Sequence, residues 1–87
     1  MFKLFRRKNN FTVCVDWKKR GDVAYVIAKY MCLESDECYY KRDEKCYIGF
    51  VTRLTLDEVL KELMINLDGY TEIVGNTIFV ELFKDKA

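Results

Sequence analysis

Residues 55–69 read Thr55-Leu-Asp-Glu-Val-Leu-Lys-Glu-Leu-Met-Ile-Asn-Leu-Asp-Gly69, which is the pattern of an amphipathic helix. Thr55 and Glu58 have the spacing of a capping box, in which two side chains accept hydrogen bonds from backbone N–H groups of the first turn. The apolar residues then recur at helical spacing and form one stripe: Leu56, Val59, Leu60, Leu63, Met64 and Leu67. Gly69 is expected to end the helix in the left-handed conformation. Because such a stripe must be buried, the neighbouring segments must supply a surface that covers it.

Strands are predicted on both sides of this helix. Residues 11–17 alternate strictly, with four large apolar residues on one face: Phe11, Val13, Val15 and Trp17. Residues 38–54 read as a hairpin with its turn at residues 42–44. Residues 71–83 contain a turn at Gly75-Asn76, and a last strand follows with Ile78, Val80 and Leu82 on one face.

A second helix is predicted over residues 23–34, after a loop at residues 18–22, with Asp22 as its N-cap. Its apolar face would hold Val23, Val26, Ile27, Tyr30 and Met31. The Val and Tyr content leaves a strand as the alternative here. The order strand, helix, strand, strand, helix, strand predicts an α+β, ferredoxin-like βαββαβ fold: a four-stranded antiparallel sheet with both helices on one face. The other face would stay open for binding.

Length and charge indicate one small domain. The 87 residues suffice for a single core, and residues 1–10 are interpreted as a basic N-terminal arm before a domain at residues 11–87. Residues 1–45 hold 11 Lys or Arg against 7 Asp or Glu, a balance of +4, whereas residues 46–87 hold 4 against 7, a balance of −3. No apolar run approaches the ~20 residues that span a bilayer, and no secretory signal is visible. We therefore expect an intracellular, cytoplasmic protein that does not contact a membrane.

The residues that enzymes and metal sites require are scarce. The chain has no His, no Gly-rich phosphate loop and no Ser nucleophile motif, so we expect no enzyme, no catalytic residue and no cofactor. The spacing of Cys14, Cys32, Cys38 and Cys46 lacks the close pairs of a zinc site, so no metal is expected. Cys38 and Cys46 are symmetric about Arg42 and would form a disulfide if they face each other across the hairpin; in a reducing cytosol they would stay thiols.

Two segments resemble the RNA-recognition-motif family. Residues 67–82 are similar to the end of its second helix and its last strand, and Gly49-Phe50-Val51 within residues 45–51 matches the centre of its third-strand motif. The resemblance implies that aromatics on the first and third strands stack bases. Phe50 would occupy one stacking position, whereas Ile48 occupies the other. The outward residues of the first strand, Thr12, Cys14 and Asp16, include no aromatic.

Basic and tyrosine residues supply the candidate binding surface. The cations Lys18, Lys19, Arg20, Lys41 and Arg42 lie in loops or at the hairpin tip, near Tyr39, Tyr40 and Tyr47. They would join the N-terminal arm in one contact patch, or form an ordinary solvated surface. Tyrosine with interspersed arginine is typical of protein interfaces and of nucleic-acid sites.

The sequence therefore predicts a small, non-catalytic interaction module. The first hypothesis is a protein-binding or inhibitor-type protein that uses the hairpin, the basic loops and an open sheet face bearing Phe50 and Phe79. Its richness in Lys, Asn, Ile and Tyr is typical of small viral or mobile-element proteins. The second hypothesis is a single-stranded nucleic-acid-binding protein, and the third is a structural subunit that forms a homodimer through an edge strand.

Overall fold

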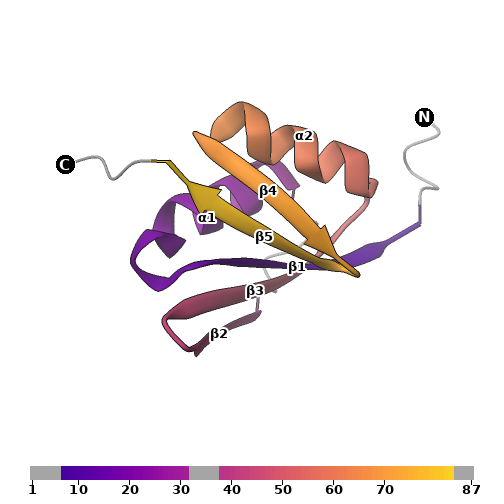
Figure 1. Cartoon of the computed structure of the whole chain (residues 1–87). Helices are drawn as coiled ribbons and strands as arrows, with labels where there is room; N and C mark the ends of the chain where they lie inside the picture. The colour runs from indigo at the N-terminus through magenta and orange to yellow at the C-terminus, as the bar shows by residue number, and fades with distance from the viewer. Residues whose placement is uncertain (1–6, 32–37, 84–87) are drawn as a thin grey trace.

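The computed structural model describes residues 7–31 and 38–83, which form an α+β fold (Figure 1). The elements follow in the order β1 (Asn9–Asp16), η2 (Trp17–Lys19), α1 (Arg20–Val26), η3 (Ile27–Met31), β2 (Cys38–Arg42), β3 (Lys45–Thr52), α2 (Leu56–Asn66), β4 (Gly69–Val74) and β5 (Thr77–Leu82). The α+β class that the sequence predicts is thus confirmed.

The sheet has five strands in the order β2-β3-β1-β5-β4, so the prediction of a four-stranded antiparallel sheet is wrong. β1 pairs with β3 antiparallel, as expected, but it pairs with β5 parallel. The difference arises after α2. The residues just before the predicted turn at Gly75-Asn76 form a strand of their own, β4. β4 and β5 are paired as an antiparallel hairpin. Since β4 takes the outer position, β5 lies beside β1 and runs in the same direction.

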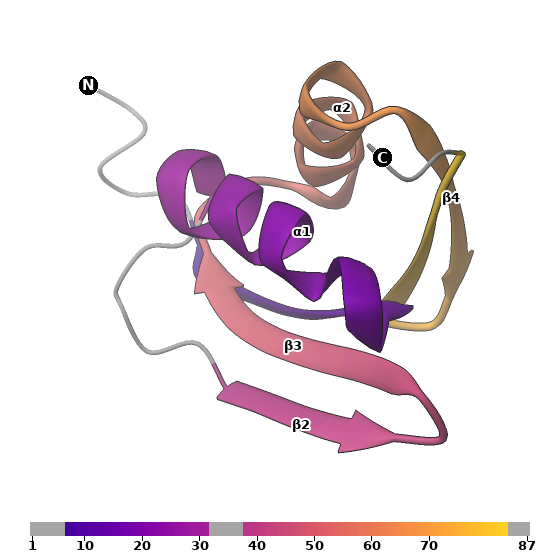
Figure 2. The same ribbon diagram turned by 90° about the vertical axis from the view of Figure 1, so that its left-hand side faces the viewer.

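Both helices lie on the same side of the sheet, which curves around them (Figure 2). α1 and α2 bury their apolar faces against alternate residues of the central strands. The buried core includes Val13 and Val15 of β1, Ile48 of β3, Leu63 of α2 and Ile78 of β5. The opposite side of the sheet is covered by no helix of the described chain, as the sequence predicts.

α2 begins as the sequence indicates. The Thr55 backbone N–H donates to Glu58 Oε1 at 2.9 Å, and the Glu58 N–H donates to Thr55 Oγ1 at 3.2 Å, which is the complete capping box. Its end differs from the prediction. The helix stops at Asn66, Leu67 has an extended backbone, and Gly69 is the first residue of β4 without a positive φ. Gly69 therefore has another role, which concerns its contact with β5.

The helix predicted over residues 23–34 is confirmed as far as Met31, and the strand alternative is wrong there; residues 32–34 lie outside the described part of the chain. The start is earlier than predicted. Asp16 caps it by accepting a 2.9 Å hydrogen bond from the Lys18 N–H, so Trp17 begins a helical turn and Asp22 lies inside the first turn of α1. The last five residues form a π-helix. In it Ile27 and Met31 are buried, whereas Tyr30, predicted on the buried face, is exposed.

The β2–β3 hairpin closes where the sequence predicts, through a two-residue turn at Asp43-Glu44. Both residues have a positive φ, 52° and 65°, which defines a type I′ turn. This conformation suits Asn and Gly, whereas a left-handed residue with a larger side chain costs about 1–2 kcal/mol. A hydrogen bond nevertheless stabilises the position of the turn, since the Glu44 carbonyl accepts a 2.9 Å hydrogen bond from the Trp17 N–H.

We expect the double substitution Asp43→Asn with Glu44→Gly to raise the free energy of unfolding by about 1 kcal/mol. The Lys41–Glu44 ion pair that it removes is exposed, with a 4.0 Å separation, and contributes little. Thermal unfolding should shift upward by about 4–8 °C. Gly75→Ala is the matched control of opposite sign, because Gly75 has a φ of +63° and open space around its Cα. An unchanged or lower melting temperature in the double variant would contradict the argument.

Candidate functional site

The strand register divides the sheet residues into two faces, because residues that pair directly across neighbouring strands share a face. One set packs under the helices. The other set forms the uncovered face, named here the open face: Cys38, Tyr40 and Arg42 of β2, Lys45, Tyr47, Gly49 and Val51 of β3, Asn10, Thr12, Cys14 and Asp16 of β1, Thr77, Phe79 and Glu81 of β5, and Tyr70, Glu72 and Val74 of β4.

Three aromatic residues lie in register across the open face. Tyr40 pairs with Tyr47, Tyr47 pairs with Cys14, and Cys14 pairs with Phe79. The rings of Tyr40 and Tyr47 stack with centroids 5.0 Å apart and an angle of 7° between their planes. We call Tyr40, Tyr47 and Phe79 the aromatic row. It presents flat, rigid side chains on a surface that no described element covers.

Cys14 links the two ends of the aromatic row. It is only 3% exposed, although it lies on the open face, because Tyr47 and Phe79 flank it. A hydrogen bond with Cys14 raises the pKa of the Tyr47 hydroxyl. Cys14 thus fills the space between Tyr47 and Phe79 on the open face.

A second aromatic group extends the open face to its outer edge. The ring of Tyr70 on β4 lies 5.8 Å from that of Phe83, which follows β5. The Tyr70 hydroxyl donates to Glu81 Oε1 at 3.2 Å, and this bond raises the pKa of Tyr70. Sequence reasoning missed both residues, because the face of β4 that holds Tyr70, Glu72 and Val74 is mixed and does not show the apolar–polar alternation of a half-buried strand.

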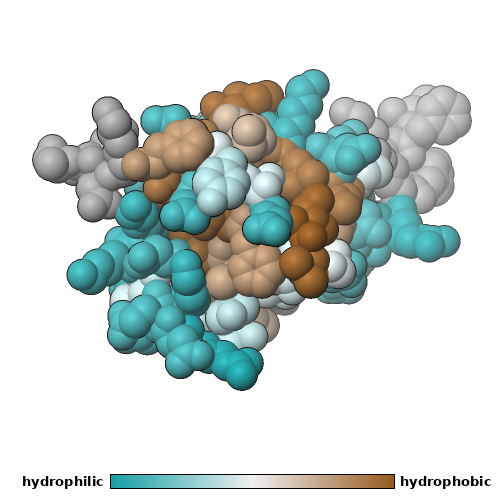
Figure 3. Space-filling model, in the orientation of Figure 1, coloured by the Kyte–Doolittle hydropathy of each residue, from teal (hydrophilic) through white to brown (hydrophobic). Residues whose placement is uncertain are grey.

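Charges of both signs flank these aromatics. Arg42 and Lys45 lie at the β2–β3 end, Asp16 is paired with Lys45, and Glu72 and Glu81 lie at the β4–β5 end. Figure 3, which views the molecule from the side of β4 and β5, shows apolar residues gathered across the middle of this surface, with hydrophilic residues around them. The open face is thus an apolar and aromatic centre with a mixed-charge surround.

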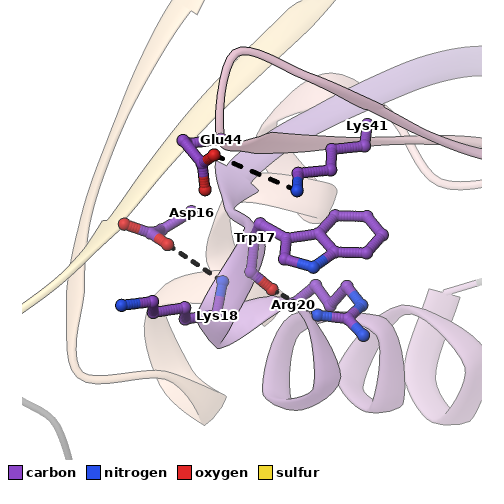
Figure 4. Close-up of polar contacts among 6 residues, drawn as sticks. All are labelled: Asp16, Trp17, Lys18, Arg20, Lys41 and Glu44. Carbon is purple, nitrogen blue, oxygen red and sulfur yellow. Dashed lines mark hydrogen bonds and ion pairs between the residues drawn. The ribbon is translucent and has the colours of Figure 1, made fainter.

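The predicted basic residues Arg20 and Lys41 are brought together around Trp17 (Figure 4). The Arg20 guanidinium lies 3.8 Å from the indole centroid on one side, and the Lys41 ammonium lies 5.1 Å from it. Arg20 Nη1 also donates to the Trp17 carbonyl at 2.7 Å. These two cations therefore fasten the hairpin tip to the start of α1, which is a structural role.

The other predicted cations are spread over the surface near this point. Lys18 and Arg42 are exposed, and Lys19 Nζ donates to the Leu82 carbonyl at 3.3 Å. Asn9 and Asn10 already belong to β1, at the end that pairs with Thr52, whereas the hairpin tip pairs with the other end of β1. Residues 1–6 of the predicted arm lie outside the described part of the chain.

Phe50 and Tyr39 lie away from the open face. Phe50 is 3% exposed, pairs with Phe11 and packs under the helices, with the two ring centroids 6.3 Å apart. The prediction that Phe50 is a surface stacking residue is therefore wrong, because the register turns Gly49 and Val51 outward instead. Tyr39 is exposed, but it shares the helix side with its partner Ile48. Of the predicted tyrosines, Tyr40 and Tyr47 are the pair that the open face brings together.

The described cysteines are free thiols, and Cys38 and Cys46 do not face each other across the hairpin, so the condition for a cross-strand disulfide is not met. Cys38 pairs with Gly49 and lies on the open face, whereas Cys46 pairs with Lys41 and is fully buried on the helix side. The symmetry about Arg42 misleads because the turn centre lies between Asp43 and Glu44. Burial raises the pKa of the Cys46 thiol, which further lowers its reactivity.

We expect iodoacetamide to alkylate Cys38 in the folded protein and to leave Cys14 and Cys46 unmodified until the chain unfolds. The reason is access, since Cys38 is exposed while the other two are 3% and 0% exposed. Peptide mass mapping after timed labelling, with and without denaturant, separates the sites. Labelling of Cys46 as fast as Cys38 in native buffer would contradict the assigned register.

A groove of about 560 Å³ lies between the two helices at one end of the molecule. Its lining comes from α1, η3, the end of α2 and β5: Asp22, Tyr25, Val26, Tyr30, Asn66, Leu67, Asp68 and Leu82. Lys29 donates to the Tyr25 hydroxyl at 3.2 Å, which raises the pKa of Lys29. The lining includes no thiol or imidazole, and the described residues contain no cluster of metal-binding side chains.

Comparison with protein-family models, with curated proteins and with solved structures gave no match to this chain. Within the described residues, no helix has the length and apolar character to cross a membrane. The chemistry of the open face is therefore the main guide to function.

Proposed function

We propose that this protein is a small, non-catalytic protein-binding or inhibitor-type module, and that its open face is the binding surface. The observation that carries the proposal is the aromatic row, exposed on a sheet face that no described element covers. Tyr40 is 54% exposed and Phe79 is 37% exposed. Large aromatic side chains contribute much contact area at a small entropic cost, and they dominate the energetics of protein interfaces.

The charges of the open face favour a protein over a nucleic acid. Its cations are Arg42 and Lys45, and its carboxylates are Asp16, Glu72 and Glu81. A single-stranded nucleic acid needs a basic groove that follows its phosphates across the stacking residues. Here the β4–β5 half would repel phosphate. A protein surface with both charge signs can instead be complementary to each half.

A peptide-display selection tests this function without knowledge of the natural partner. We expect the immobilised protein to enrich peptides that fail to bind the double variant Tyr40→Ala with Phe79→Ser. Tyr25→Ala is the matched control, because Tyr25 is 59% exposed on α1, away from the open face. Peptides that bind all three proteins equally would contradict the use of the open face.

Single-stranded nucleic-acid binding is the second candidate, and the stacked pair Tyr40–Tyr47 beside Arg42 is the observation that favours it. Resemblance of residues 45–51 and 67–82 to the RNA-recognition motif agrees with this candidate. Titration with short RNA and DNA pools at low and physiological salt separates it from the first. Affinity that falls steeply with salt and is lost in Tyr47→Ala would replace the protein-binding proposal, because phosphate contacts release counterions.

A further inference from the structure

We infer that the partner contributes an extended segment that pairs with the outer edge of β4 as a sixth strand of the sheet. The segment would alternate apolar residues with residues that include Lys or Arg. This inference rests on the proposed protein-binding function and specifies the kind of partner. Its starting point is that β4 is an end strand, so none of the described strands pairs with its outer side.

The hairpin geometry shows which backbone groups of β4 are available. β4 and β5 are joined by the two-residue turn Gly75-Asn76, in which Gly75 alone has a positive φ, as in a type II′ turn. In such a hairpin the two residues that flank the turn, Val74 and Thr77, each donate a backbone N–H to the C=O of the other. Along an antiparallel ladder, hydrogen-bonded residue pairs alternate with pairs that form no hydrogen bonds to each other. The N–H and C=O groups of Thr71 and Ile73 therefore point away from β5, toward the side of β4 on which no described strand lies.

Apart from Glu72, β4 lacks the features that protect edge strands from pairing. Natural edge strands usually carry Lys, Pro or a bulge. At the opposite edge of the sheet, β2 follows this rule with Lys41 and Arg42. β4 is regularly paired over its six residues and contains neither Lys, Arg nor Pro. Its edge is thus the more receptive of the two.

Exposed apolar side chains lie on both sides of the β4 edge. Tyr70 and Val74, on the open face, are 48% and 62% exposed, and Ile73, on the helix side, is 39% exposed. α2 adds Met64, which is 51% exposed. Asn66 lines the groove between α2 and α1. Met64, two residues earlier, lies on the opposite flank of α2, which is the flank toward β4 (Figure 2). Apolar residues of an added strand would pack against Ile73 and Met64.

The carboxylates of β4 and β5 favour a segment of a different protein over a second copy of this chain. Glu72 points to the open face in the middle of β4, and Glu81 lies on the neighbouring strand. Two copies joined through β4 would bring these four carboxylates together, and like charges across a ladder are destabilising. A partner strand with Lys or Arg on its open-face side would instead place a cation beside Glu72.

A synthetic peptide of about nine residues, alternating Val and Lys, is the probe. We expect it to bind the protein at least about tenfold more tightly than the same peptide with Glu in place of Lys. Two N-methylated versions of the peptide form a matched pair. One is methylated on every second backbone amide, and the other is methylated on the remaining amides. One should lose binding because its blocked amides face β4, whereas the other should retain it.

On the protein side, Thr71→Pro removes an outward N–H from β4 without breaking its ladder with β5, and Thr71→Val keeps that N–H. We expect Thr71→Pro to lower the affinity of the protein for the Val–Lys peptide about tenfold or more, and Thr71→Val to leave this affinity unchanged. If Thr71→Pro fails to fold, as judged by circular dichroism, the N-methylated pair decides the question on the unaltered protein.

The inference is overturned if both N-methylated peptides bind as tightly as the parent, or if the Val–Lys peptide does not bind. The proposed function survives that result when display-selected peptides still lose binding in Tyr40→Ala with Phe79→Ser and are indifferent to Thr71→Pro. If no selected peptide depends on the open face, the proposed function fails as well.

Discussion

Gly69→Ala is expected to destabilise the protein by about 3 kcal/mol, although it adds only one methyl group. A Cβ at this position would clash with the Glu81 carbonyl oxygen and would lie 2.9 Å from Leu82 Cα. Both are backbone atoms of β5, so no side-chain rotation can relieve the clash. Either β4 or the end of β5 must move, which disturbs the pairing of Gly69 with Leu82. In a domain of this size the melting temperature should fall by at least about 12 °C.

Gly21→Ala is the matched control for Gly69→Ala. Gly21 lies in the first turn of α1, is exposed, and a Cβ there would meet nothing within 4 Å. Since alanine favours helix over glycine by up to about 1 kcal/mol, we expect Gly21→Ala to be neutral or stabilising. Urea unfolding of the two variants gives the comparison. A Gly69→Ala protein as stable as the unaltered chain would show that β4 and β5 do not approach so closely.

The contrast between the two ends of α2 shows what the sequence can and cannot predict. Its start depends on Thr55 and Glu58, which are three residues apart, so the capping box can be recognised from local spacing. The same local reasoning predicts that the helix ends at Gly69. The need for glycine there comes instead from β5, more than ten residues further along the chain. The close approach of β4 to β5 depends on tertiary structure. In the sequence, a glycine required for such an approach looks the same as a glycine that ends a helix.

The number of strands was missed for a related reason. The turn at Gly75-Asn76 was predicted, but the residues before it were not assigned to a strand of their own. Tyr70, Glu72 and Val74 face solvent, and the helix side of the strand begins with Gly69 and Thr71. β4 therefore lacks the apolar alternation that identifies β5. Its pairing is imposed by the hairpin, which also makes β5 parallel to β1.

The candidate site could be predicted only in part. The alternation of β1 indicates correctly that Thr12, Cys14 and Asp16 face outward. The aromatic row, however, combines residues of β2, β3 and β5, and its register follows from the turns. At Asp43-Glu44 the type I′ turn sets Tyr40 opposite Tyr47. The stacking position of Phe50 is predicted only by the resemblance of Gly49-Phe50-Val51 to the RNA-recognition motif, whereas the register of β3 with β1 places Phe50 on the helix side.

Phe50→Ala is expected to cost about 3–5 kcal/mol of stability, the largest effect of any single substitution predicted for this chain. The ring is 3% exposed and packs with Phe11 and the apolar side chains under the helices, so its removal leaves a cavity. Small domains have about 5–15 kcal/mol of stability in total, so this variant should be largely unfolded on mild heating. Phe79→Ala is the matched control on the other face. Because Phe79 is 37% exposed, we expect a loss of about 1–2 kcal/mol.

Phe50→Leu separates the structural role of this residue from a role in binding. Leucine fills most of the same space and should cost less than about 1.5 kcal/mol, so the protein stays folded. If Phe50 acts only in the core, as its burial indicates, Phe50→Leu should bind selected peptides or nucleic acid as the unaltered protein does. Phe79→Ser should lose that binding. A folded Phe50→Leu protein that no longer binds, measured at equal concentration by titration, would mean that the ring reaches the ligand and that the register of β3 is wrong.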